Sequence, residues 1–196
     1  MTEWTAVLQL LHLLATVYMA APLYMLLVVN ERVRFGAPLG YYTDRYMENI
    51  IKHHAQRCFI VLGTVLVTGL LLIWADGFTF AMVVKSWTLW LKLVATIALF
   101  GFLSYVHFYL QPRIEALISQ VKPDQPPPKE LGVQVGALRI RRKRLSALCL
   151  FTVLTAVAMG VRMLTGYPAW LAIVFVAVIA VFAYRTFKAP LPYGWF

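Results

Sequence analysis

The residues of this sequence with most scope for chemistry are ionisable side chains inside long apolar segments. The stretch LWLKLVATIALFGFLSYVHFYL, residues 89–110, carries Lys92 near one end and His107 near the other. His12 lies in the apolar stretch near the N-terminus, and Arg162 lies near the end of another. Such groups are costly to place in hydrocarbon, so each predicts a functional site by default.

These side chains fall into two predicted layers. At about 1.5 Å of rise per residue, His12 and Lys92 lie roughly 8–11 Å inside the outer ends of their helices. Arg162, in the last turn of its segment, belongs to the same outer layer. The inner layer contains three histidines: His107, His53 and His54.

The histidines in these two layers are predicted to bind haem. Histidine is a common axial ligand of haem iron, and an apolar cleft between helices suits a porphyrin. We expect one haem b in the outer layer at His12. Lys92 or Arg162 would pair with its propionates. Alternatively, Lys92 would be the second axial ligand, if burial removes its proton.

A second haem is expected in the inner layer, between His107 and one of the adjacent histidines. His54 is preferred over His53 because it projects close to the direction of Gly69, the expected packing face of that helix. The expected metal ligands are therefore His12, His107 and His54.

Each of these side chains also has a simpler interpretation. A histidine can bond to a neighbouring hydroxyl or backbone group, or face solvent or headgroups, and a lysine or arginine can extend to the membrane surface. Methionines in the apolar segments are candidate copper ligands, because thioethers bind Cu(I). They form no tight MxxM array, so packing is the favoured interpretation.

The elements that position these residues are membrane-spanning helices. Of 196 residues, 61% are hydrophobic, more than a soluble domain of this size can bury. The net charge of +10 does not predict nucleic-acid binding, because basic residues also gather on one side of membrane proteins. We predict an all-α integral membrane protein, a single domain over residues 1–196. Its five spans cover residues 5–29, 58–75, 87–110, 145–165 and 168–187.

The basic residues predict the orientation of these spans. Fifteen of the 18 lie in 30–57, in 111–144 or in the C-terminal tail from Arg185, so alternating spans place the N-terminus outside and the C-terminus in the cytoplasm. This predicts a multi-pass protein of the inner (cytoplasmic) membrane. The segment 111–144 contains KPDQPPPKE and is expected to be a stiff, exposed loop. Its basic run RIRRKR, 139–144, is expected to clamp anionic lipid, or else to dock an acidic partner.

Three segments resemble known helices. LQLLHLLATVYMAAPLYML (8–26), VLVTGLLLI (65–73) and WLKLVATIALFGF (90–102) are similar to the first three helices of HemJ-type protoporphyrinogen oxidases and CopD-like membrane proteins. The resemblance covers residues 5–165. It implies that His12 is associated with b-type haem and that Lys92 is a functional position. His107 lies about a turn beyond the family's own histidine, and the fifth span is additional, which weakens the expectation of oxidase activity.

The expected function is that of a membrane b-type cytochrome-like subunit with one or two haems. It would transfer electrons between a quinol and a redox partner subunit, within a larger membrane complex. The alternatives are a HemJ-like protoporphyrinogen oxidase, a CopD-like copper permease, and a cofactor-free accessory subunit.

Overall fold

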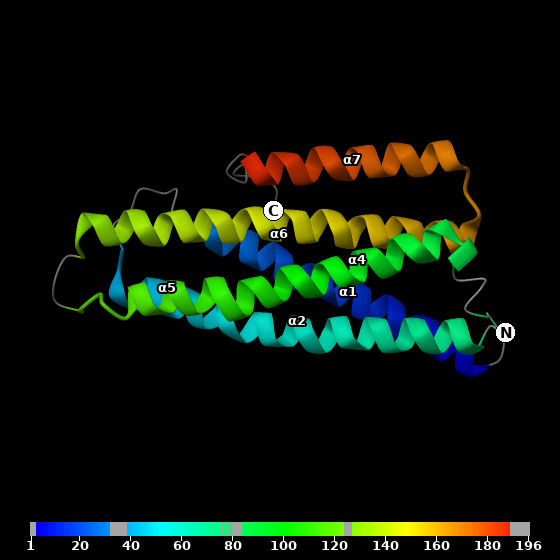
Figure 1. Cartoon of the computed structure of the whole chain (residues 1–196), viewed down its shortest axis with the longest axis horizontal. Coiled ribbons are helices and arrows are strands. Elements are labelled where there is room, and N and C mark those ends of the chain that lie inside the picture. Colours follow the sequence, from blue (N-terminus) through cyan, green and yellow to red (C-terminus); the bar gives the residue numbers. More distant parts are fainter. Residues whose placement is uncertain are drawn as a thin grey trace.

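The computed structural model describes residues 3–31, 39–75, 77, 79, 84–123 and 127–188. Every long element within them is a helix (Figure 1). In chain order these are α1 (Glu3–Glu31), α2 (Tyr41–Ala75), α4 (Trp87–Tyr105), the π-helix η2 (Val106–Leu110), α5 (Gln111–Ile118), α6 (Lys129–Thr165) and α7 (Ala169–Lys188).

Five candidate membrane spans exist within the described residues, which confirms the all-helical, five-span fold class. They are Glu3–Ala21, Tyr41–Ala75, Trp87–Ile118, Lys129–Thr165 and Ala169–Lys188. Large apolar side chains are exposed along all of them, as at Ile60, Ile97 and Ile173. Outward-facing apolar surface of this extent fits lipid as the surrounding solvent.

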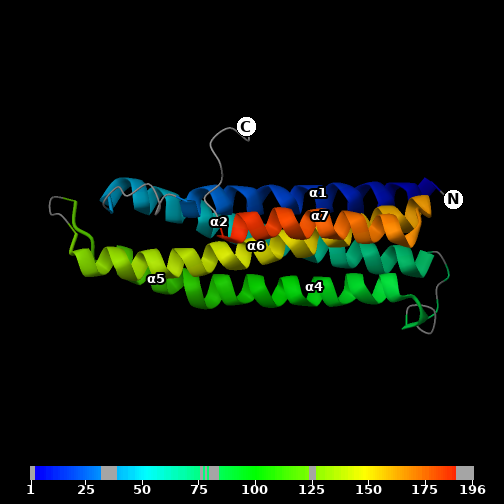
Figure 2. The ribbon, with the colours of Figure 1, turned by 90° about the horizontal axis from the view of Figure 1, so that it is seen from above.

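The bundle has two chemically distinct ends. The Arg-rich end is formed by the start of α2, by α5 and by the start of α6, and the Trp-rich end by the end of α2, the start of α4 and the α6–α7 connection (Figure 1). Four helices share the interior between these ends, and α7 packs along α6 (Figure 2). The central buried cluster draws on α1, α2, α4 and α6: Met19, Leu62, Leu99, Cys149 and Val153.

The prediction that residues 111–144 form a loop is wrong for 111–118 and for 129–144. The chain is helical over Gln111–Ile118 and again from Lys129, so the connection between helices covers only 119–128. The prolines break the helix locally, but apolar residues spaced along both flanks pack against one another. Ile114, Ile118 and Val135 form a buried cluster that holds α5 against α6. Burial of these side chains, rather than the local propensity of the segment, decides its structure.

The helix that begins at Trp87 continues through a proline by changing its hydrogen-bonding pattern. Pro112 has no N–H, and its ring would clash with the carbonyl of Phe108 in a regular α-helix. The turn before it is a π-helix, in which the Gln111 N–H donates to the Val106 carbonyl. π turns are rare overall, but those that occur are often found at functional sites. His107 lies inside this π turn, which makes it a candidate functional residue.

Candidate functional site

His12 is oriented by a hydroxyl from a neighbouring helix. Its Nδ1 lies 2.9 Å from Oγ1 of Thr68 on α2. The Thr68 hydroxyl donates its one proton to the Thr64 carbonyl, at 2.7 Å, so in the bond to His12 it accepts. In the neutral tautomer that matches these two bonds, His12 carries its proton on Nδ1 and its lone pair on Nε2.

A glycine makes room for this ring. A Cβ atom at Gly69 would lie 3.2 Å from Cε1 of His12, closer than ordinary van der Waals contact. The sequence VTGLL thus supplies both the hydroxyl that bonds the imidazole and the space the imidazole occupies. One turn after His12 on α1, the Thr16 hydroxyl donates to the His12 carbonyl at 2.7 Å.

Lys92 reaches the same layer from α4. Its ammonium lies against Gly160 of α6, where a Cβ atom would be 3.3 Å from Nζ. An electrostatic interaction links Lys92 with His12, although no described hydrogen bond joins the two side chains. No described residue exchanges a hydrogen bond with Lys92 Nζ.

Four helices therefore build one polar layer inside the bundle. We use this name for His12, Thr68 and Lys92 with the flanking glycines Gly69 and Gly160. Lys92 follows the start of α4, and Gly160 precedes the end of α6, by five residues each, or about 7.5 Å. The polar layer thus lies well inside the Trp-rich end and within the apolar part of the spans.

Arg162 does not join this layer through any described contact. Its Nε donates to the Tyr167 carbonyl at 3.3 Å, and its guanidinium stacks on the ring of Trp87 with 5.1 Å from Cζ to the centroid. Both partners lie at the Trp-rich end, so Arg162 points toward that end, although its Nη1 is buried without a hydrogen-bond partner among the described residues. This geometry fits the simpler of the two interpretations of Arg162.

His107 is enclosed by aromatic rings. Its imidazole meets the ring of Phe59 on α2 edge to face, at 5.6 Å between centroids, and that of Phe108 at 4.9 Å. Its Nδ1 is buried and has no hydrogen-bond partner among the described residues. A buried polar atom without a partner costs roughly 1–3 kcal/mol, so this nitrogen is a ready ligand or donor.

The two histidines expected opposite His107 have different environments. His53 is exposed, and its Nδ1 donates to the Asn49 carbonyl at 2.7 Å. His54 is half-buried. None of the described contacts joins either ring to His107, whose neighbour on α2 is Phe59. Within the described residues there is also no group of three or more His, Cys, Asp or Glu that could hold a metal ion.

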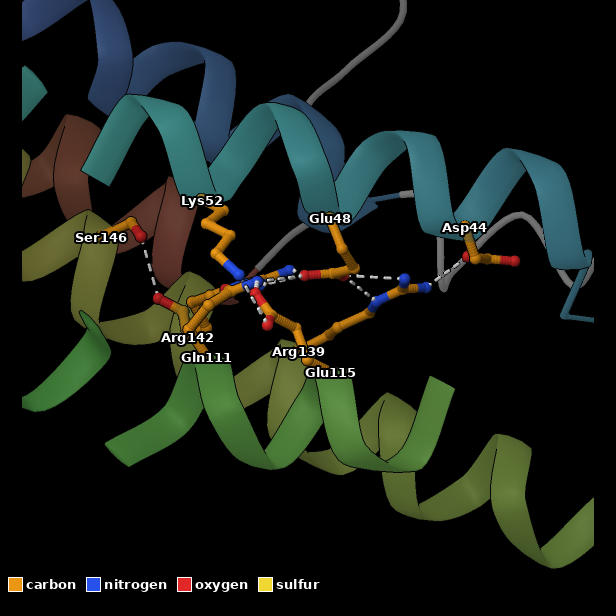
Figure 3. A network of polar contacts seen from close by, with 8 residues as sticks. All are labelled: Asp44, Glu48, Lys52, Gln111, Glu115, Arg139, Arg142 and Ser146. Atoms are coloured by element: carbon orange, nitrogen blue, oxygen red, sulfur yellow. Dashed lines mark hydrogen bonds and ion pairs between the residues drawn. The ribbon is translucent and has the colours of Figure 1, made fainter. Parts of the chain in front are cut away.

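Sequence reasoning missed a buried network of charges at the Arg-rich end (Figure 3). Arg142 is fully buried and binds Glu48 with both terminal nitrogens, at 2.6 and 3.0 Å. Arg139 donates to Glu48 at 2.9 Å and to Asp44 at 2.6 Å. Gln111 joins the network by donating to Glu48 and accepting from Arg142, at 3.1 and 2.7 Å.

This network is balanced in charge and holds three helices together. We call Asp44, Glu48, Gln111, Arg139 and Arg142 the buried ion network. Two carboxylates face two guanidinium groups, so burial leaves no net charge uncompensated. Asp44 and Glu48 are four residues apart on α2, and Arg139 and Arg142 are three apart on α6. This spacing along one helix face is the signal that could have revealed it.

The carboxyl of Glu48 lies outside the apolar part of α2, ten residues before Cys58. Burial alone raises the pKa of Glu48. The opposing effects are together larger: the charges of Arg142 and Arg139, and hydrogen bonds from Arg142 and Gln111, lower this pKa. Its pKa therefore lies below the ordinary value, and the carboxylate stays ionised at neutral pH.

Two of the arginines expected to clamp lipid are thus structural. Arg139 and Arg142 of the RIRRKR run point into the bundle, and Lys143 is also buried. Arg141 and Arg144 of the same run are exposed. The helical period divides the run between an inward face and an outward face.

Comparison of this chain with protein-family models, with curated proteins and with solved structures gives no match. The resemblance to HemJ-type oxidases and CopD-like proteins therefore stays an expectation from the sequence.

Proposed function

We propose that this protein is a membrane b-type cytochrome-like subunit that binds haem b at the polar layer. The observation that carries the proposal is the hydrogen bond between His12 and Thr68, because it leaves His12 Nε2 available as a ligand. Histidines that bind metals usually donate their other ring N–H to a neighbouring acceptor, which fixes the tautomer and the ring orientation.

The residues of the polar layer fit this group. The porphyrin itself supplies four ligands to the iron, so one or two protein ligands suffice and no larger metal-binding cluster is needed. His12 offers an imidazole nitrogen, and Lys92 offers either a cation for a propionate or, deprotonated, a second axial nitrogen. The surrounding spans offer the apolar environment that haem requires.

Haem, when bound, supplies one-electron transfer. The protein contributes the rest through its own residues: Thr68 holds His12 in one tautomer, Lys92 contributes positive charge near it, and the apolar helices exclude water. Burial, axial ligands and nearby charge are the features by which a protein adjusts haem potential.

A second haem, on the opposite side of the bundle, is part of the same proposal. Its support is the unpartnered, buried Nδ1 of His107 on the π turn. His54, or His53, would be the opposite ligand. With the N-terminus outside and the C-terminus in the cytoplasm of an inner membrane, two haems would carry electrons between a quinol and a redox partner subunit of a larger complex.

A HemJ-like protoporphyrinogen oxidase is the second candidate. It is favoured by the electrostatic interaction between His12 and Lys92, the two positions that the family resemblance singles out. Turnover of protoporphyrinogen by the purified protein with a quinone acceptor would distinguish an oxidase from an electron-transfer subunit.

Reduced-minus-oxidised spectra with pyridine haemochrome quantification test the cofactor. We expect haem in the wild-type protein, its loss in His12→Ala at the outer site, and its loss in His107→Ala and His54→Ala at the inner site. Thr16→Val is the matched control, because among the described residues its hydroxyl bonds only the His12 carbonyl, one turn away.

Three results would contradict this assignment. Unchanged haem content in His12→Ala would remove the outer ligand. A folded but colourless protein would favour the cofactor-free accessory subunit, and Cu(I) binding without a Soret band would favour the copper permease.

A further inference from the structure

Two tyrosines and two arginines form a continuous stack on the surface of the Arg-rich end. The rings of Tyr105 and Tyr109 are stacked, with 5.1 Å between centroids and 24° between planes. Cζ of Arg113 lies 3.8 Å from the centroid of Tyr109. Cζ of Arg141, from α6, lies 5.3 Å from the centroid of Tyr105. We call these four residues the arginine–tyrosine ladder.

The charges of the ladder are not neutralised within the described part of the chain. Arg113 and Arg141 are exposed, and no described carboxylate forms an ion pair with either of them. Arg139 and Arg142, by contrast, are paired with carboxylates inside the bundle. The ladder therefore presents two free guanidinium groups where the adjacent arginines are internally compensated.

The ladder lies at the depth of lipid headgroups. Tyr105 and Tyr109 occupy the last turns of the apolar segment 87–110, and Arg113 follows it by three residues. Arg141 precedes the apolar segment that starts at Leu145 by four residues. At about 1.5 Å per residue, the Cα atoms of both arginines lie roughly 5–6 Å beyond the ends of these apolar segments. Tyrosine is enriched at this same boundary.

Stacking also prepares the guanidinium groups for an anion. A free arginine loses side-chain entropy when it binds, whereas one already held against a ring loses less. Guanidinium groups bind phosphate through two parallel hydrogen bonds, and stacking on a ring face leaves their N–H edges open. Two such groups, one on each side of a tyrosine pair, offer two separate positions for the phosphates of anionic headgroups.

We propose that the arginine–tyrosine ladder binds the phosphates of anionic phospholipids in the leaflet at the Arg-rich end. Arg113 and Arg141 each contact a lipid phosphate, and Tyr109 and Tyr105 hold them in place. The proposal is independent of haem and of which side of the membrane this end faces.

Native mass spectrometry of the detergent-purified protein, titrated with phosphatidylglycerol or phosphatidylcholine, tests it. The double variant Arg113→Gln/Arg141→Gln should bind phosphatidylglycerol about 10- to 30-fold more weakly, from about 1 kcal/mol for each basic residue near the surface. Its binding of phosphatidylcholine should change less. Arg113→Lys/Arg141→Lys keeps both charges but not the planar fork, and should lie between wild type and the glutamine variant.

The matched control is Arg45→Gln/Lys129→Gln. It removes the same charge from exposed residues at the same end, and Arg45 also stacks on a tyrosine, Tyr41. These residues lie 13 and 16 positions before the apolar segments at Cys58 and Leu145, more than about 19 Å away. The control should therefore bind phosphatidylglycerol like wild type, and equal melting temperatures would show that both variants fold.

Several outcomes would overturn the proposal. Equal weakening in the control would mean that total charge, not the ladder, attracts the lipid. Unchanged binding in the ladder variant would mean that the site lies elsewhere. Displacement of phosphatidylglycerol by inorganic phosphate at equal concentration would identify a soluble anion as the ligand.

Discussion

At the scale of single residues, the protein's most informative group is the hydroxyl of Thr68. It donates to a backbone carbonyl and accepts from His12, so it decides which ring nitrogen stays free. Valine has nearly the same shape as threonine but cannot accept this bond. In the proposed site, the Thr68 hydroxyl would therefore act on haem only through the orientation of His12.

We predict that Thr68→Val weakens haem retention by about 10- to 100-fold, the usual cost of removing a partner of a metal-binding histidine. Thr64→Val is the matched control one turn away, because its exposed hydroxyl donates only to the Ile60 carbonyl. Haem transfer to apomyoglobin, timed by absorbance, measures retention. Equal transfer rates for the two variants would show that Thr68 does not orient a ligand.

Arg142 tests the buried ion network at the same scale. Arg142→Met would leave Glu48 buried with fewer partners, and removing one member of a buried pair costs about 3–5 kcal/mol. The Lys52–Glu115 pair, at 3.1 Å, is partly exposed, so Lys52→Met should cost at most about 1 kcal/mol. Unfolding free energies in mixed micelles measure both. A loss for Arg142→Met no larger than that for Lys52→Met would mean that water reaches the network.

At the scale of elements, α5 and the first half of α6 are stabilised by packing that local sequence does not reveal. Val133 and Val135 lie two residues apart on α6, yet Val133 is 73% exposed and Val135 is fully buried against α5. The two valines have the same helix propensity but different burial. Comparing their substitutions therefore measures the contact between α5 and α6 separately from helix propensity.

We predict that Val135→Ala lowers the unfolding free energy by about 1–3 kcal/mol, the worth of the lost methyl groups plus a cavity. Val133→Ala should change it by less than about 0.5 kcal/mol. Mixed-micelle unfolding followed by tryptophan fluorescence gives both values. If the two variants behave alike, residues 111–118 do not pack on α6 as a helix.

The same elements show how far sequence reasoning reaches. Apolar runs located all five spans, because length and hydropathy are local properties. Sequence reasoning missed the helices at 111–118 and 129–144, because Pro127 and Pro128 favour a loop there. The packing of Ile114 on Val135, which stabilises these helices, is a tertiary contact that local sequence does not reveal. The partners Arg139 and Asp44 lie 95 residues apart, and His12 and Thr68 lie 56 apart. No local pattern contains such pairs, although the shared depth of His12 and Lys92 followed from helix rise.

At the scale of the whole molecule, one asymmetry organises all the features above. The polar layer lies toward the Trp-rich end, whereas the buried ion network and the arginine–tyrosine ladder lie at the Arg-rich end (Figure 1). Basic residues favour the cytoplasmic side of a bilayer, so this asymmetry predicts which side each site would serve. An outer haem at His12 would exchange electrons on the outer side, and lipid at the ladder would belong to the inner leaflet.

Cysteine labelling of intact cells tests this orientation. Lys85 lies just before α4 at the Trp-rich end and Lys129 at the start of α6, and both are exposed. We predict that a membrane-impermeant maleimide labels Lys85→Cys in spheroplasts but labels Lys129→Cys only after the membrane is opened. Wild type is the control, because Cys149 is buried and Cys58 is half-buried. The reverse pattern would mean the opposite orientation, in which the proposed haem site at His12 would lie near the cytoplasmic side.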